Sequence, residues 1–250
     1  MARFFVDALP AEGTSYTLSG ENADHARVLR LRPGEAVTLC DGAGNECECT
    51  VREGLTLLAG TVVPSPAEAR TVISVYLAFP KGDKAEHVIQ KATELGAAEI
   101  CFFPSRYCVS RPEGKALEKK LERWQKIARS AAEQSRRGII PPVRAVDSYR
   151  EALANAAAAE AALLFYENEE QLTLGEALAP FVSLGQPAPG ETEPRRISLM
   201  TGAEGGFSAE EILLARQAGL RICTLGPRIL RCETAPLAAL SAVMYALGEL

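Results

Sequence analysis

Two loops in the C-terminal third of the chain combine glycine with charged side chains. Residues 202–206 read Gly-Ala-Glu-Gly-Gly and follow the apolar residues 197–200, and residues 225–235 read Leu-Gly-Pro-Arg-Ile-Leu-Arg-Cys-Glu-Thr-Ala and follow a second apolar run. A helical pattern succeeds each loop. Because open α/β sheets bind ligands where strands end, the sequence predicts that the two loops meet around a ligand.

The first loop has the composition of a strand-to-helix turn. Residues 197–200 suit a buried strand, and Ser208 with Glu211 three residues later forms a capping box that predicts a helix start. Glycine lets a ligand approach the main chain closely. The spacing matches neither a dinucleotide fingerprint nor a P-loop, and a tight turn without any ligand is the alternative.

The second loop adds two arginines, Arg228 and Arg231, with Glu233 close behind. Arginine does not transfer protons at neutral pH, so the pair points to an anionic or electron-rich partner. A pair of solvated side chains is the alternative. From Thr234 onward the residues are small or apolar almost all round, which is typical of a helix buried in the fold or against a second subunit.

The elements that must position these loops alternate from residue 71 onward. Strands are predicted at residues 72–79, 100–103, 161–166, 197–200 and 222–225, with helical patterns between them. Residues 85–95 carry a clear helical stripe that ends at Gly96. This order predicts a mainly parallel sheet covered on both faces, an α/β fold. Residues 185–194 are predicted to be a surface connection.

The N-terminal part has a different pattern. Short β-type runs occur at residues 36–40 and 46–51, and residues 64–66 (Pro-Ser-Pro) resemble a linker. We therefore expect two domains, a small β-rich module at residues 1–70 and the α/β domain at residues 71–250.

Composition limits the class of protein. The 250 residues are 47% hydrophobic, enough for a substantial core. No run reaches membrane-spanning length and no secretory signal is recognised, so no membrane is expected and the cytoplasm is the expected location. The 7 cysteines show no Cys-x-x-Cys pair, and their odd number favours reduced thiols. No bound metal is expected.

Charge is distributed unevenly. The whole chain has a formal net charge of −5, yet residues 71–150 carry more Lys and Arg than Asp and Glu. A protein that binds RNA through phosphates needs a local basic surface and not a basic chain. A long helical stretch in this region supplies one, although a solvated helix face is the alternative. The basic residues on or just after this stretch are Lys115, Lys119, Lys120, Arg123, Lys126, Arg129, Arg136 and Arg137.

Together with residues 81–96, 132–138 and 25–34, and with Asp41-Gly42, the two loops form an ordered set of motifs. In this set the chain resembles the RsmE-type family of ribosomal RNA methyltransferases, of the SPOUT class, which methylate N3 of a uridine in small-subunit ribosomal RNA with S-adenosylmethionine. Residues 202–206 depart from the family at Ala203, where proline is usual, and residues 105–108 depart from its Ser-Glu-Arg-like run.

The resemblance implies a fold and an assembly. It implies a SPOUT-type parallel sheet in which the C-terminal chain forms a deep trefoil knot, and a PUA-like barrel at the N-terminus that helps to hold RNA. It also implies a homodimer, which would give the apolar C-terminal helix a partner.

The resemblance also implies roles for residues. The residues expected to bind S-adenosylmethionine are Leu199, Thr201, Gly202, Glu204, Gly205, Leu225, Gly226, Ile229, Leu230, Thr234 and Ala235. For catalysis we expect Arg231 first and Arg228 second to stabilise the uracil anion. Glu233 or Glu204 would accept the N3 proton, or would instead hold an arginine or a backbone amide. By charge and position, the residues expected to contact RNA are Arg27, Arg30, Lys81, Arg106, Arg136 and Arg137.

Two other functions remain open at this stage. The chain could be a noncatalytic RNA-binding or ribosome-assembly factor with a degenerate pocket, for which Ala203 is the one hint. It could also be a small-molecule enzyme that uses a nucleotide at the same sheet edge, but the basic region and the β-rich module would then lack a purpose.

Overall fold

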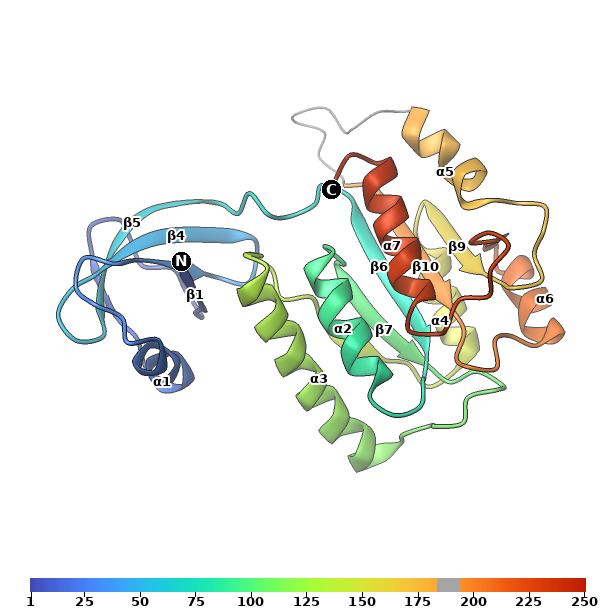
Figure 1. The fold of residues 1–250 in the computed structure, drawn as a ribbon, viewed down its shortest axis with the longest axis horizontal. Helices are drawn as coiled ribbons and strands as arrows, with labels where there is room; N and C mark the ends of the chain where they lie inside the picture. The colour runs from blue at the N-terminus through green and yellow to red at the C-terminus, as the bar shows by residue number, and fades with distance from the viewer. Residues whose placement is uncertain (184–193) are drawn as a thin grey trace. The chain divides into compact units, whose positions relative to one another are not determined.

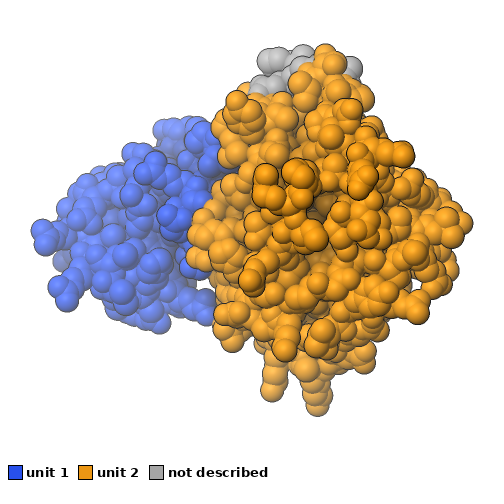
Figure 2. Space-filling model, turned by 45° about the vertical axis from the view of Figure 1, so that its right-hand side comes forward, with its two compact units in different colours: residues 1–68, 129–140 blue, residues 69–128, 141–250 orange. Residues whose placement is uncertain are grey.

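The structure is a computed structural model that describes residues 1–183 and 194–250 (Figure 1). The chain forms two compact units (Figure 2). Unit 1 comprises Met1–Glu68 and Arg129–Ile140, and unit 2 comprises Ala69–Ala128 and Pro141–Leu250. The expected surface connection, residues 185–194, lies outside the described residues except for Pro194.

Unit 1 is built on a mostly antiparallel sheet. Its described strands are β1 (Ala2–Phe5), β2 (Ser15–Thr17), β3 (Ala36–Cys40), β4 (Asn45–Val51) and β5 (Thr56–Pro64), in the order β1-β3-β4-β5-β2. Helix α1 (Gly20–Leu29) contributes Ala23 and Ala26 to the core. Cys47 and Cys49 are buried on either side of the exposed Glu48, as alternation along a strand requires. The predicted β-rich N-terminal part is confirmed.

Residues 129–140 belong to unit 1 although they follow much of unit 2 in sequence. The carboxylate of Glu68 holds this segment. It accepts hydrogen bonds from the backbone amides of Gly138 at 2.8 Å and Ile139 at 3.0 Å, and from Nη2 of Arg137 at 2.7 Å. The side chain of Arg137 is 4% exposed and that of Glu68 is 14% exposed. Each group therefore neutralises a charge that has been taken out of water.

Unit 2 contains a parallel sheet. The described strands are β6 (Val72–Ala78), β7 (Glu99–Phe103), β8 (Val143–Ala145), β9 (Ala161–Phe165), β10 (Arg196–Thr201) and β11 (Arg221–Cys223). Their order is β11-β9-β10-β6-β7-β8, and each neighbouring pair is parallel. The predicted parallel α/β sheet is confirmed.

Helices cover both faces of this sheet. The described helices are α2 (Lys84–Glu94), α3 (Gly114–Gln134), α4 (Tyr149–Ala157), α5 (Leu174–Ser183), α6 (Ala209–Gln217) and α7 (Ala235–Ala246). Helices α2 and α7 lie over one face, and α4 lies over the other (Figure 1). Helix α3 starts in unit 2, and its residues from Arg129 onward count with unit 1.

Local signals in the sequence are reproduced closely. Ser208 and Glu211 form the predicted capping box at the start of α6. Gly96 follows α2 with φ of +91°, and the amides of Gly96 and Ala97 bond to carbonyls of the last turn, as in a Schellman ending. The five strands predicted for unit 2 are present with ends shifted by a residue or two. The short strand β8 was not predicted, and the knot stays a prediction.

None of the helices within residues 1–183 and 194–250 combines the length and the apolar character that crossing a membrane requires.

We predict that Glu68→Ala destabilises the protein by about 3–5 kcal/mol, the usual cost of breaking a buried ion pair, because Arg137 is then left buried without its counter-charge. Denaturant unfolding followed by far-ultraviolet circular dichroism measures the change. Glu48→Ala, at an exposed position of β4, is the control and should change stability by no more than about 0.5 kcal/mol. Equal effects of the two substitutions would contradict the anchoring role of Glu68.

Candidate active site

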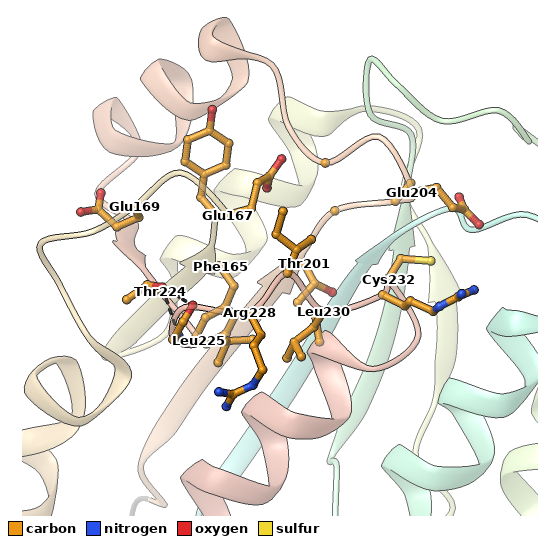
Figure 3. Close-up of a pocket in the computed structure, with 18 of the residues that line it drawn as sticks. Phe165, Glu167, Glu169, Thr201, Glu204, Thr224, Leu225, Arg228, Leu230 and Cys232 are labelled. Carbon is orange, nitrogen blue, oxygen red and sulfur yellow. Dashed lines mark hydrogen bonds between the residues drawn. The ribbon is translucent and has the colours of Figure 1, made fainter.

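A pocket of about 750 Å³ lies at the carboxyl ends of β9, β10 and β11 (Figure 3). Three loops line it: residues 166–170 after β9, the glycine loop (residues 202–206) after β10, and the arginine loop (residues 225–233) after β11. Its volume falls in the range of sites for small molecules and cofactors. The two predicted loops therefore meet as expected, at the edge where a parallel sheet binds ligands.

The glycine loop is a tight turn. The amide of Gly206 donates to the carbonyl of Ala203 at 3.0 Å, and Gly206 has φ of +63°. A Cβ on Gly202 would lie 3.0 Å from the Cα of Gly206, so this position has no room for a side chain unless the backbone moves. Alanine at position 203 keeps the turn closed.

The arginine loop presents main-chain groups to the pocket. Gly226 has φ of +99° and its amide donates to Oγ1 of Thr224 at 3.1 Å. The backbone amides of Ile229 and Leu230 donate no hydrogen bond to any part of the chain that the structure describes. Ile229 and Leu230 also line the cavity. These amides are available to acceptor atoms of a ligand.

The loop after β9 forms a wall that the sequence did not predict. Phe165, Tyr166, Glu167, Glu169 and Glu170 all line the pocket. Glu169 is tied to Arg216 at 2.9 Å, and the amide of Gln171 together with this ion pair lowers the pKa of its carboxyl group. The predicted strand ending near residue 166 was a usable signal, but only the order of the strands shows that β9 lies between β10 and β11.

Lys84, at the start of α2, connects the glycine and arginine loops. Its Nζ lies 2.9 Å from Oε1 of Glu204 and 3.3 Å from Oε2 of Glu233. Its distance to Sγ of Cys232 is 3.6 Å. The backbone amide of Lys81 donates to the same oxygen of Glu204 at 3.0 Å. One cation therefore serves two carboxylates that come from different loops.

These contacts keep both carboxylates ionised. Burial alone would raise the pKa of Glu204, but the hydrogen bonds from Lys84 and from the amide of Lys81 outweigh it and hold the pKa at about 2. The pKa of Glu233 is also lowered, by hydrogen bonds that overcome its burial. Burial raises the pKa of the neighbouring Cys232 thiol to about 12. Carboxylates with a lowered pKa are poor proton acceptors, which favours the expectation that Glu204 holds a backbone amide.

The side chains of Arg228 and Arg231 differ from the two paired carboxylates in their exposure and in their contacts. Both side chains are exposed at the pocket, and within the described parts of the chain neither forms an ion pair or a side-chain hydrogen bond. Figure 3 shows Arg228 projecting from the arginine loop, away from Thr201 and Leu230. Each guanidinium is thus free to donate to an anionic group.

The pocket gathers most of the residues expected to bind the cofactor. Those that line it are Thr201, Gly202, Glu204, Leu225, Gly226, Ile229, Leu230 and Ala235. Leu199, Gly205 and Thr234 lie outside the lining. Leu199 is fully buried within β10, and Gly205 is so close to Tyr107 that a Cβ would lie 2.6 Å from the Cβ of that residue. Arg228 and Arg231 line the pocket, whereas Glu233 is absent from the lining and pairs with Lys84, which does line it.

Four of the residues expected to contact RNA lie in unit 1. Arg27, Arg30 and Arg136 are exposed, although Arg27 pairs with Asp24 at 2.6 Å. Arg137 is buried and bound to Glu68, so its guanidinium holds the unit together and is not presented to a ligand. Counting charges could not separate this buried arginine from its exposed neighbour.

The other two lie in unit 2. Lys81 is exposed at the turn before α2. Arg106 is exposed as well and pairs with Glu210 at 3.0 Å, while its backbone amide donates to the buried carboxylate of Glu211. Such an exposed pair contributes little to stability and can exchange for a phosphate.

Comparisons with known proteins agree with this geometry. Residues 67–244 match the RNA methyltransferase domain family, and residues 18–54 match the RNA methyltransferase PUA domain family. The chain is 36% identical to ribosomal RNA small subunit methyltransferase E of Bacillus subtilis, covering 98% of this chain and 96% of the relative. It is 35% identical to the protein of that name from Mycobacterium tuberculosis, covering 96% and 90%.

Solved structures of methyltransferases are also similar to this chain. The structure of ribosomal RNA small subunit methyltransferase E from Neisseria gonorrhoeae, bound to S-adenosyl methionine, superposes with a TM-score of 0.81 at 33% identity, covering 98% of this chain and 97% of the other. A methyltransferase from Legionella pneumophila, in complex with the same cofactor, gives a TM-score of 0.80 at 29% identity, with the same two coverages. Both cover the PUA and methyltransferase parts together.

We predict that the stabilising contribution of Glu204 depends on pH. Its folded-state pKa of about 2 lies below the ordinary value of 4.5, so the contribution is complete above pH 4.5 and is lost as pH falls toward 2. Glu204→Gln should therefore lower the unfolding free energy at pH 7, by about 1.5–3 kcal/mol for a charged hydrogen bond, and by less at pH 3.

Unfolding in urea at several pH values measures this difference. Glu118→Gln, an exposed position of α3 without an ion pair in the described residues, is the matched control and should show no such trend. A difference for Glu204→Gln that stays constant from pH 7 to pH 3 would contradict the ion pair with Lys84.

Proposed function

This chain belongs to the ribosomal RNA small subunit methyltransferase E family, and we propose that it methylates N3 of a uridine in small-subunit ribosomal RNA. It is an enzyme that uses S-adenosylmethionine and acts on ribosomal RNA. The observation that carries the finer proposal is the pocket edge, where Arg228 and Arg231 of the arginine loop line the cavity and form no ion pair with any residue that the structure describes.

The pocket suits the cofactor. The apolar side chains of Phe165, Leu225 and Leu230 provide surfaces for an adenine ring, and the amides of Ile229 and Leu230 provide donors. The carboxylates of Glu167 and Glu170 supply negative charge toward a ligand that carries a sulfonium and an ammonium group. When bound, S-adenosylmethionine supplies an electrophilic methyl group.

The arginines supply the substrate chemistry. As the uracil N3 loses its proton, negative charge develops on the carbonyl oxygens on either side of it. A guanidinium presents several donors and keeps its charge, so Arg231, with Arg228 second, stabilises that anion electrostatically. Glu233 acts through Lys84 and does not itself take the proton, because its pKa is lowered.

The proposal assigns roles to the two parts of the chain. Residues 1–70 hold the RNA as a PUA-like domain, and residues 71–250 form the methyltransferase domain. Arg27, Arg30, Lys81, Arg106 and Arg136 contribute to phosphate binding. The enzyme works in the cytoplasm, where its ribosomal RNA substrate is located.

The proposal also includes a homodimer built on α7. This helix is apolar almost all round, and Tyr245 is 78% exposed on the side away from the core. An exposed aromatic on an apolar helix is suited to a subunit interface. Sedimentation velocity tests it: we expect the mass of a dimer for the native chain and a shift toward monomer for Tyr245→Lys.

We predict that the product is 3-methyluridine. Small ribosomal subunits and free small-subunit RNA that lack the modification are incubated with the enzyme and labelled cofactor. Nucleoside mass spectrometry identifies the methylated base, and primer extension stops where it occurs because an N3 methyl group blocks Watson–Crick pairing. Methylation of a ribose or of a carbon atom would disprove the N3 assignment while leaving the methyltransferase activity intact.

We predict that Arg231→Ala reduces the rate of methyl transfer by about 10²–10³-fold, the usual cost of losing a donor to a developing anion, while the affinity for the cofactor changes little. Single-turnover kinetics and calorimetry measure the two quantities. Arg150→Ala, at an exposed position of α4, is the control. A folded Arg231→Ala variant with near-normal turnover would contradict the assignment.

A further inference from the structure

The amino group of Lys84 occupies a position between the two principal loops of the pocket. The side chains of Lys84, Glu204 and Glu233 are 27%, 29% and 21% exposed, so water screens their charges only in part. Glu204 belongs to the glycine loop and Glu233 to the arginine loop. Lys84 lies on α2 and belongs to neither loop. We call this group the Lys84 clasp.

The two carboxylates depend on this one cation. Arg228 and Arg231 are the other cationic side chains among the residues that line the pocket, and neither is paired with Glu204 or Glu233. The thiol of Cys232 stays protonated and carries no charge. Without Lys84, two partly buried negative charges would face each other across the gap between the loops, and they would repel.

The separation between the glycine loop and the arginine loop also affects how well the pocket binds a ligand. Gly202 and Leu225 both line the cavity, and they belong to the two loops that the clasp connects. A ligand that contacts both loops at once binds well only when they are held at the right separation before it arrives, because ordering them on binding costs free energy.

We propose that Lys84 is a positioning residue, which fixes the glycine loop and the arginine loop at the separation needed to bind S-adenosylmethionine and does not touch the reacting atoms. This inference rests on the proposed function, since it concerns the same pocket. The proposal implies that cofactor affinity depends on a positive charge at position 84, which an arginine can also supply.

The experiment compares four variants with the wild-type protein. Lys84→Met removes the charge at similar size, Lys84→Arg keeps it, and the double variant Lys84→Met with Glu204→Gln removes the repulsion together with the cation. Lys91→Met is the matched control, because Lys91 also lies on α2 and pairs with a carboxylate, Glu94, at 2.8 Å but is absent from the pocket.

Calorimetry with S-adenosylmethionine measures the affinity, and thermal unfolding measures the stability of the same samples. We expect Lys84→Met to bind about 10- to 100-fold more weakly, the range for losing a charged hydrogen bond. Lys84→Arg and the double variant should each recover a large part of this loss. Lys91→Met should bind like the wild type.

Amide hydrogen exchange without any ligand tests the clasp independently of the cofactor. Exchange in residues 202–206 and 225–233 should become faster in Lys84→Met and remain unchanged in Lys91→Met. Wild-type protein that binds no S-adenosylmethionine would refute the proposed function, while the exchange data would still decide the role of Lys84. Unchanged exchange in Lys84→Met, or a failure of Lys84→Arg to restore affinity, would overturn the inference.

Discussion

The parallel pairing of β10 with both β6 and β9 is the constraint on which the pocket depends. In this register Thr201 lies beside Leu77, and Met200 lies beside Leu164. Strand β11 pairs with β9 so that Cys223 lies beside Phe165. The four strands therefore end at nearly the same level, and the loops that follow them emerge at one edge. No single loop makes the site, because each supplies one wall.

The same register explains how an ion pair can join residues that are far apart in sequence. Lys84 follows β6 and Glu204 follows β10, and because these strands are neighbours, the two side chains reach each other over a separation of 120 residues. Glu233 arrives from the arginine loop at the start of α7, which packs against β10 and β6. The electrostatics of the pocket are thus a consequence of strand order.

The features that the sequence predicted are those that depend on neighbours along the chain. The capping box at Ser208, the helix ending at Gly96 and the buried runs of the strands each depend on residues that are close together in the chain. Strand order is different, because it is decided by packing across the whole unit. The wall after β9 and the partners of Lys84 could therefore not be predicted, although the lysine and both glutamates were visible in the motifs.

The burial of individual side chains was the second property that could not be predicted from the sequence. Charge counting grouped Arg136 with Arg137, yet one is exposed and the other is 3% exposed and bound to Glu68. The segment that carries them returns to unit 1 at the end of a helix that starts in unit 2. A helical pattern gives no sign of which unit its last turn will join. In such a segment only the partner of an arginine separates a structural residue from one that can bind RNA.

The distribution of charge at the pocket bears on the reaction itself. Glu204 and Glu233 share a cation, and their pKa values are lowered, whereas Arg228 and Arg231 form no ion pair with the residues that the structure describes. A site built for proton abstraction would place a carboxylate with a raised pKa at the substrate. This site instead presents the permanent positive charge of Arg228 and Arg231, which in our proposal stabilises the substrate anion once it forms. For uracil N3, the weakly acidic target that we propose, such stabilisation lowers the free-energy cost of losing the proton to water, and the proposed reaction then does not require a strong protein base.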